Sequence, residues 1–176
     1  MRKQTDNNKE QGQSLVELAM SLVVLLILVA GLVDLGRAFF TYVALRDAAQ
    51  EGASYASIVN GEALESASDV SDYCTAIANR VIITTTDLSG GTATSNGPIN
   101  LQALKAAGEV HVNTLINGTG CALISPADVC MGGAVSVEVS YDHFPLTMPF
   151  IGSILGTQEL EISATVVDSI LTPACQ

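Results

Sequence analysis

The sequence predicts an α+β protein in which one long N-terminal helix crosses a membrane and continues into a small domain beyond it. Three observations support this prediction. An apolar run of membrane length follows a short polar start, an amphipathic helical pattern without proline continues it, and three later segments alternate apolar and polar residues as β-strands do. The 176 residues leave room for this helix and one small domain.

The start of the chain predicts the orientation of the membrane span. Residues 1–12 form a polar leader with three basic side chains, Arg2, Lys3 and Lys9. Basic residues next to a span stay on the cytoplasmic side. We therefore expect a single-pass protein of the inner, or cytoplasmic, membrane, with a cytoplasmic leader, a transmembrane helix over residues 13–40 and an extracytoplasmic domain over residues 41–176.

The predicted span contains sixteen consecutive uncharged residues, Leu18 to Val33. It extends to residue 40 if Asp34 pairs with Arg37 one turn away and the arginine reaches the membrane surface. Cleavage as a secretory signal peptide near Ala30 is an alternative. The helical pattern continues through that position, which favours a retained span.

The helix is expected to continue over residues 41–60 as an amphipathic, alanine-rich segment. Its small and apolar residues recur at three- and four-residue steps: Ala38, Tyr42, Leu45, Ala49, Ala53, Ala56 and Val59. One helix from Ser14 to Asn60 would be ~70 Å long, against a hydrocarbon core of ~30 Å, so its distal half would project from the membrane. Its small residues would let a helix or sheet approach closely.

A second helix and a sheet complete the predicted domain. Apolar residues at helical spacing predict the second helix over Asp69 to Thr84, followed by a loop rich in Thr, Ser and Gly over residues 84–97. A three- to four-stranded antiparallel sheet, covered by the two helices, is predicted from alternation in three segments, residues 110–116, 135–141 and 160–166.

The connection over residues 144–156 is apolar and contains Pro145 and Pro149. Because proline does not fit inside a strand, we expect a non-strand segment there. An apolar connection of this length must be buried, touch lipid or meet a partner.

Charge and motif content exclude several functions. The net charge is −11, and residues 50–176 hold only Arg80 and Lys105 against thirteen carboxylates, so nucleic acid is not an expected partner. No enzyme motif is present, and His111 and His143 have no second ligand at metal-binding spacing, so we expect no enzyme activity, no metal and no cofactor. The sequon at Asn117 is a match of only three residues.

All four cysteines lie beyond the span, which predicts disulfides in an oxidising compartment. Three connectivities are possible. Closeness in sequence favours Cys121–Cys130, which leaves Cys74–Cys175. The alternative is four reduced, buried thiols.

The junction from Gly12 to Glu17 allows two interpretations. Ser14 and Glu17 have the spacing of a capping box that would open a helix. The same residues resemble the cleavage site of type IV prepilins, with cutting after Gly12, a new N-terminus at Gln13, and a glutamate near the start of an apolar helix. A carboxylate in a span costs ~2.5 kcal/mol or more at the membrane centre, so Glu17 needs a partner. The freed amino group of Gln13 on an adjacent subunit would be one.

The N-terminal third resembles the TadE-like family of the tight adherence (Tad) pilus system. The resemblance rests on the GQ-x-x-VE opening and on six further positions, Asp34, Gly36, Arg37, Gly52, Ala53 and Tyr55. Residues 134–168 also resemble the general plan of the family. The resemblance implies a pilin-like, membrane-anchored minor pseudopilin or accessory component of pilus assembly, secretion and adherence.

The implied partners are the lipid bilayer, other pilus or pseudopilin subunits and a prepilin peptidase, and the cell surface or the pilus is a further implied location. One alternative is a permanently bitopic surface protein whose outer domain binds a ligand or adheres outside any filament. Another is a filament-forming structural pilin.

Overall fold

The structure is a computed structural model that describes residues 8–58, 67–83, 99–129, 131–148, 152–153 and 156–171. Two compact units are present. The first combines the N-terminal part of helix α1 (Asn8–Ile58), through Arg37, with the described residues between Leu146 and Gln158. The second unit contains the chain from Ala38, in the remainder of α1, to Pro145. It also contains the segment that begins at Glu159. The α+β class and the antiparallel sheet are confirmed.

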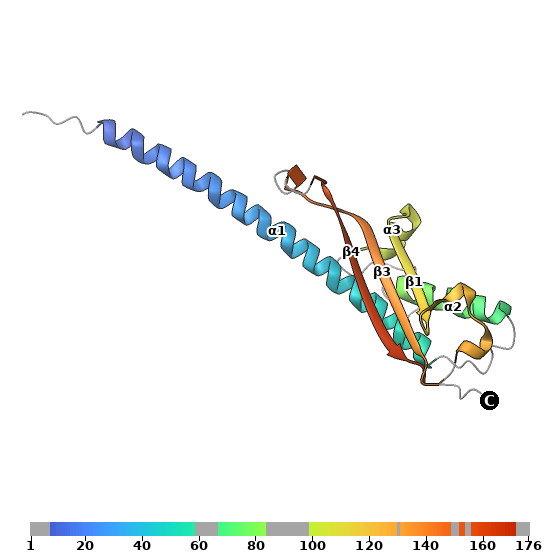
Figure 1. The fold of residues 1–176 in the computed structure, drawn as a ribbon. Helices are drawn as coiled ribbons and strands as arrows, with labels where there is room; N and C mark the ends of the chain where they lie inside the picture. The colour runs from blue at the N-terminus through green and yellow to red at the C-terminus, as the bar shows by residue number, and fades with distance from the viewer. Residues whose placement is uncertain are drawn as a thin grey trace, which may run out of the picture. The chain divides into compact units, whose positions relative to one another are not determined.

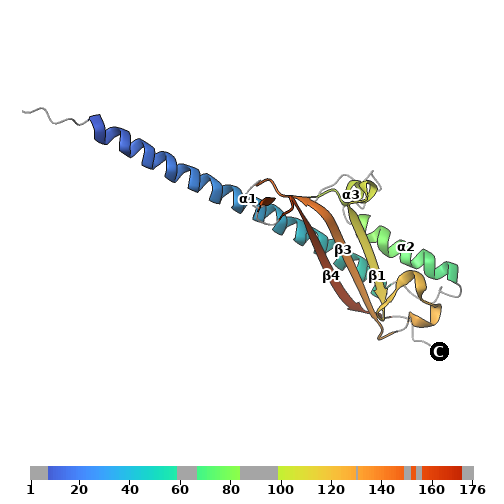
Figure 2. The same ribbon diagram turned by 45° about the horizontal axis from the view of Figure 1, so that its top comes forward.

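The second unit is a four-stranded antiparallel sheet with helices on one face (Figures 1 and 2). Its strands, in the order β2-β1-β3-β4, are β1 (Val110–Ile116), β2 (Thr119–Gly120), β3 (Ala134–Pro145) and β4 (Glu159–Ser169). The three alternating segments of the sequence are therefore strands, as predicted, and β2 adds a short edge strand.

The core lies between this sheet and two helices, the distal part of α1 and α2 (Ala67–Ile83). The apolar alternation of β3 points one set of side chains at the helices, and the small residues of α1 face them. The fully buried members are Leu45, Ala49, Ala53 and Ala56 of α1, Ile77 and Val81 of α2, and Val135, Val137 and Val139 of β3. Each buried valine, leucine or isoleucine contributes about 1.5–3 kcal/mol of transfer free energy. The expected cover of the sheet is confirmed.

The sequon at Asn117 forms a hairpin turn. Asn117 and Gly118 form the two-residue loop between β1 and β2, with positive φ values of 51° and 81°. A type I′ turn requires positive φ at both central residues and favours Asn-Gly there. The Asn117 side chain donates to the carbonyl of Asp128 and accepts from the backbone N–H of Ala134. Its amide is therefore used to join the hairpin to the start of β3.

Among the described residues, three short helices were not predicted from the sequence. They are α3 (Leu101–Ala107) and the 3-10 helices η2 (Cys121–Leu123) and η3 (Pro126–Asp128). The signals for α3 were local: Asn100 accepts a bond from the Ala103 N–H at the start of the helix, and Gly108 adopts the left-handed conformation at its end.

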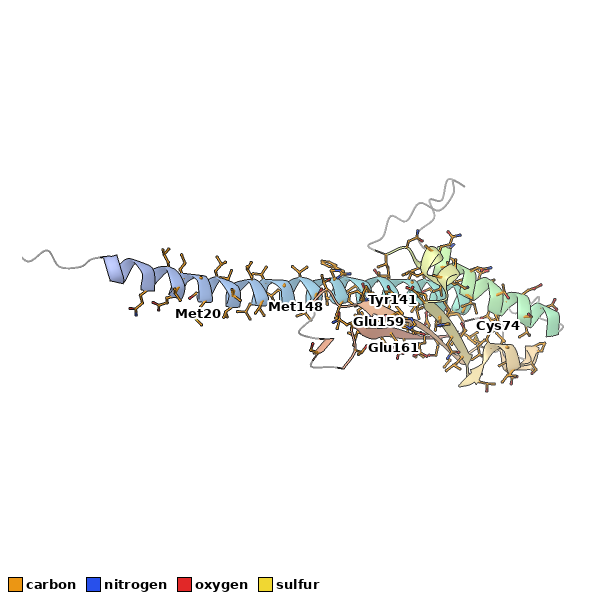
Figure 3. All side chains as sticks on the ribbon, turned by 90° about the horizontal axis from the view of Figure 1, so that it is seen from above. Met20, Cys74, Tyr141, Met148, Glu159 and Glu161 are labelled. Carbon is orange, nitrogen blue, oxygen red and sulfur yellow. A yellow bond between two sulfur atoms is a disulfide. The ribbon has the colours of Figure 1, made fainter. Side chains whose placement is uncertain are left out.

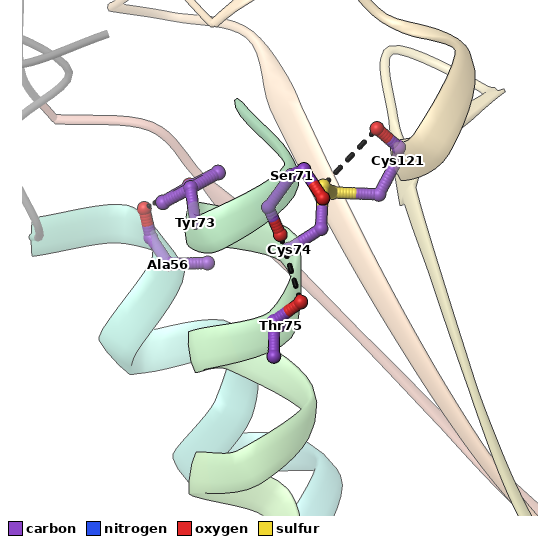
Figure 4. Close-up of a disulfide and its surroundings, with 6 residues drawn as sticks. All are labelled: Ala56, Ser71, Tyr73, Cys74, Thr75 and Cys121. Carbon is purple, nitrogen blue, oxygen red and sulfur yellow. Dashed lines mark hydrogen bonds between the residues drawn. A yellow bond between two sulfur atoms is a disulfide. The ribbon is translucent and has the colours of Figure 1, made fainter. Parts of the chain in front are cut away.

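The disulfide pairing differs from the prediction. Cys74 of α2 is bonded to Cys121 of η2, with 5.9 Å between their Cα atoms (Figure 4). Both expected pairs, Cys121–Cys130 and Cys74–Cys175, are therefore wrong. The β1–β2 hairpin returns the chain so that η2 packs against α2, and this tertiary contact, rather than closeness in sequence, selects the partner. Cys130 and Cys175 lie outside the described residues.

The prediction of a non-strand segment over residues 144–156 is partly wrong as well. Phe144 and Pro145 belong to β3, where they pair with Leu160 and Glu159 after a register shift that follows Tyr141. Pro145 is tolerated because it is the last residue of the strand. Pro149, the end of the long helix at Asn60 and the loop over residues 84–97 lie outside the described residues.

Candidate functional site

The N-terminal part of α1 exposes a long apolar surface. Its leucine, valine and isoleucine side chains between Leu15 and Val33 are 40% or more exposed, and Met20 projects from the helix with 69% of its side chain exposed (Figure 3). Such a surface is far larger than the apolar patches that water-soluble monomers leave exposed. One helix among the described residues is long and apolar enough to cross a membrane.

Gly12, Gln13 and Glu17 all lie on this helix with exposed side-chain positions. The capping-box interpretation of Ser14 and Glu17 is wrong, since α1 already begins at Asn8 and both residues lie within it. Among the described residues, Glu17 has no ion-pair partner. Its carboxylate is therefore available to a group outside this chain.

Asp34 and Arg37 form a polar clasp with Thr147 and Met148, the part of the 144–156 connection that lies in the same unit. The Asp34 carboxylate, 2% exposed, accepts a 2.8 Å hydrogen bond from the Met148 backbone N–H and lies 3.4 Å from an Arg37 guanidinium nitrogen. That guanidinium also donates to the Thr147 hydroxyl. The predicted pairing of Asp34 with Arg37 is present, and the connection contacts the helix that carries both residues.

An apolar groove of about 520 Å³ opens beside this clasp. One wall is a face of α1 whose residues, from Val23 to Asp34, follow one another mostly at three- and four-residue steps. The other wall is formed by Thr147 and Met148. Met148 lies against the helix (Figure 3), and a Cβ at Gly31 would lie 3.6 Å from its sulfur, an ordinary van der Waals distance. The groove and the clasp are therefore two parts of one site on the apolar helix.

The second set of motif residues, Gly52, Ala53 and Tyr55, lies in the other unit. A Cβ on Gly52 would come within 2.4 Å of Val81 of α2 and 3.5 Å of Val137 of β3, so only glycine allows this approach of helix, helix and sheet. Ala53 is fully buried beside it, and Tyr55 is half-buried. By contrast, a Cβ on Gly36 would meet no described atom within 4 Å.

Tyr73 of α2 fixes the end of α1. Its hydroxyl donates a 2.8 Å hydrogen bond to the Ala56 carbonyl, and the Leu171 N–H donates to the Ser57 carbonyl. These two bonds join the last described turn of α1 to α2 and to the residues that follow β4. Burial, with the nearby Tyr55 hydroxyl as a smaller cause, raises the pKa of Tyr73 to about 12.

These features define the class of protein: one N-terminal helix with the length and composition of a single membrane span, continued by a disulfide-bonded α+β domain. Residues 12–54 match the family model described as TadE-like protein, which confirms the resemblance seen in the N-terminal motifs. The match, over this part of the chain, suggests a component associated with the Tad pilus.

The match covers Gly12, Glu17, the Asp34–Arg37 motif and Gly52, and it ends before Tyr55. The resemblance of residues 134–168 to the family lies beyond it and stays a prediction. No curated protein and no solved structure shows significant similarity to the chain.

Proposed function

We propose that this protein is a membrane-anchored minor pseudopilin or accessory component of the Tad pilus that acts in pilus assembly, secretion and surface adherence without catalysing a reaction. The observation that supports this most strongly is the TadE-like match over residues 12–54, the part of α1 that also carries the apolar surface. The protein inserts in the inner membrane with its N-terminus in the cytoplasm and its α+β domain on the other side.

A prepilin peptidase is proposed to cut after Gly12. The exposed position of this glycine and the polar residues before it support access by an enzyme at the membrane surface. The new N-terminus is then Gln13, one turn before Glu17. The α-amino group of Gln13 on a neighbouring subunit pairs with Glu17, which has no ion-pair partner among the described residues of its own chain.

Mass spectrometry of the N-terminus tests the processing step. The native protein is isolated from cells with and without the prepilin peptidase, together with the variant Gly12→Val. We expect a terminal peptide that begins at Gln13 only for the unaltered chain in cells that hold the peptidase. Retention of residue 1 in all three samples would sink the processing proposal and favour a permanently bitopic surface protein.

Co-purification tests the role of Glu17. Glu17→Ala and Glu17→Gln are expected to reach the membrane fraction normally but to lose pilus or pseudopilin partners after crosslinking. Asp47→Ala, which removes an exposed carboxylate from a later part of the same helix, is the matched control. If Glu17→Gln recovers its partners as fully as the control, the ion pair is not what holds the subunits together. Filaments assembled from this chain alone would instead indicate a structural pilin.

A further inference from the structure

We propose that the groove between α1 and Thr147–Met148 binds one acyl chain of a membrane phospholipid, whose phosphate faces Arg37. The proposal rests on the membrane anchoring proposed above and adds a lipid site to it. One phospholipid molecule is then a specific ligand of the groove and the clasp, while the rest of the bilayer surrounds the span.

The lining of the groove excludes a polar occupant. The α1 wall between Val23 and Val33 consists of aliphatic side chains, and Met148 contributes its thioether. The Asp34 carboxylate, which lines one end of the groove, already accepts a hydrogen bond from the Met148 N–H at 2.8 Å. A buried water needs two or more polar partners, so the groove favours a hydrocarbon occupant.

The length of the groove matches one leaflet. From Val23 to Asp34 the helix rises ~17 Å at 1.5 Å per residue, close to half of the ~30 Å hydrocarbon core. Arg37 follows one turn later, at the depth where the headgroup phosphate lies. A chain that fills the groove therefore ends at the polar clasp.

The charge at that end is complementary to a phospholipid. The Arg37 side chain is held by Asp34 and Thr147, and 45% of it remains exposed. A guanidinium carries five N–H donors in a planar fork that suits phosphate. Arg37 lies one turn beyond Asp34, the last α1 residue that lines the groove. A partly exposed guanidinium therefore follows the hydrocarbon surface, as the anionic head follows the apolar tail in a phospholipid.

Lipid retention by the full-length protein tests the proposal. The protein is extracted from membranes in mild detergent, and bound phospholipid is counted by native mass spectrometry. Ala30→Phe fills the groove, and Ala19→Phe adds the same ring to the span outside it. We expect the unaltered chain and Ala19→Phe to retain a phospholipid and Ala30→Phe to retain about tenfold less, because displacing two methylene groups suffices for such a change.

A second measurement places the lipid. The protein is reconstituted in vesicles of phosphatidylethanolamine and phosphatidylglycerol that contain a phosphatidylglycerol with a diazirine on its acyl chain. After illumination, labelled peptides are expected to contain Met148, and Arg37→Gln is expected to lower this label more than Arg37→Lys does. Equal lipid retention by Ala30→Phe and Ala19→Phe, or the absence of label from the peptide that contains Met148, would overturn the proposal.

Membrane fractionation and formation of the Cys74–Cys121 disulfide are measured for every variant. If fractionation and disulfide formation are normal but Ala30→Phe retains as much lipid as Ala19→Phe, the lipid site alone is overturned. Loss of the unaltered chain from the membrane fraction overturns the anchoring on which both proposals depend.

Discussion

The carboxylate of Asp34 accepts a 2.8 Å hydrogen bond from the backbone N–H of Met148, a residue 114 positions later in the chain. This bond joins the apolar helix to the connection between β3 and β4 within one compact unit. It gives a nearly fully buried carboxylate a donor besides Arg37 and holds one wall of the apolar groove. Asp34 is thereby satisfied by its own chain, whereas Glu17 has no ion-pair partner among the described residues.

Removal of the Asp34 carboxylate should release the connection. Asp34→Ala is expected to speed hydrogen exchange at the Met148 amide by about tenfold or more, since hydrogen bonds to charged groups contribute about 1.5–3 kcal/mol. Asp34→Asn keeps one carbonyl acceptor and should show a smaller change. The matched control is Asp47→Ala, an exposed position on the same helix. Unchanged exchange at Met148 in Asp34→Ala would show that the clasp does not hold the loop.

Substitution of the two motif glycines should have opposite effects. Gly52→Ala places a methyl group 2.4 Å from Val81 and is expected to destabilise the α+β domain by about 1–3 kcal/mol. Gly36→Ala meets no described atom within 4 Å and should be neutral or stabilising by up to about 1 kcal/mol, because alanine favours the helix. Urea unfolding of the full chain in detergent measures both. Val81→Ala should rescue Gly52→Ala; failure to do so would argue against the clash.

The disulfide pairing can be read directly by peptide mapping under non-reducing conditions. We expect a linked peptide that contains Cys74 and Cys121. Their sequence separation is 47 residues, and a loop of this size stabilises the folded state by about 4 kcal/mol in the chain-entropy account, so the double variant Cys74→Ser/Cys121→Ser should lose stability of that order. A linked peptide of Cys121 with Cys130 would contradict the structure.

Tyr73 should make the domain sensitive to alkaline pH. The pKa of Tyr73 is raised to about 12 in the folded state from an ordinary 10.0, so the unfolded chain loses its proton first. The contribution of Tyr73 to the free energy of unfolding should therefore be fully present below pH 10 and fall as the pH rises from 10 towards 12.

Tyr73→Phe should remove this alkaline loss and, at neutral pH, cost about 0.5–1.5 kcal/mol for the hydrogen bond to the Ala56 carbonyl. Unfolding curves across this pH range test both effects, with Tyr42→Phe at an exposed position of α1 as the control. The same alkaline loss in Tyr73→Phe as in the unaltered chain would assign it to other groups.

Much of the fold could be predicted because its signals are periodic and local. The alternation in β3 and β4 and the helical spacing of α2 reflect burial on one face, which each segment encodes by itself. The helix α3 was missed because it is a short element with weak periodicity, although Asn100 and Gly108 mark its ends. The capping-box interpretation of Ser14 was wrong because the helix starts earlier than the apolar run does.

The candidate site could be predicted only in part. The sequence predicted the pairing of Asp34 with Arg37 and identified the apolar connection separately. The hydrogen bond between positions 34 and 148 joins residues far apart in the chain, and no local pattern encodes it. Close approach by a helix or sheet was predicted for the small residues of the amphipathic segment. Gly52 was named only as a residue of the family motif, and its neighbours Val81 and Val137 were not named.

The sequence by itself determined the membrane-length helix, the α+β class and the TadE-like N-terminal motifs, since these depend on residue type and spacing along one segment. Only the tertiary structure decided the partner of Cys121 and the hydrogen bond from the Met148 N–H to Asp34. A thiol or a carboxylate bonds to the group that packing brings within a few ångströms. For Cys74 and Cys121 the β1–β2 hairpin and the packing of η2 against α2 bring the two residues together. Separation along the chain predicts neither this pair nor the bond from Met148 to Asp34.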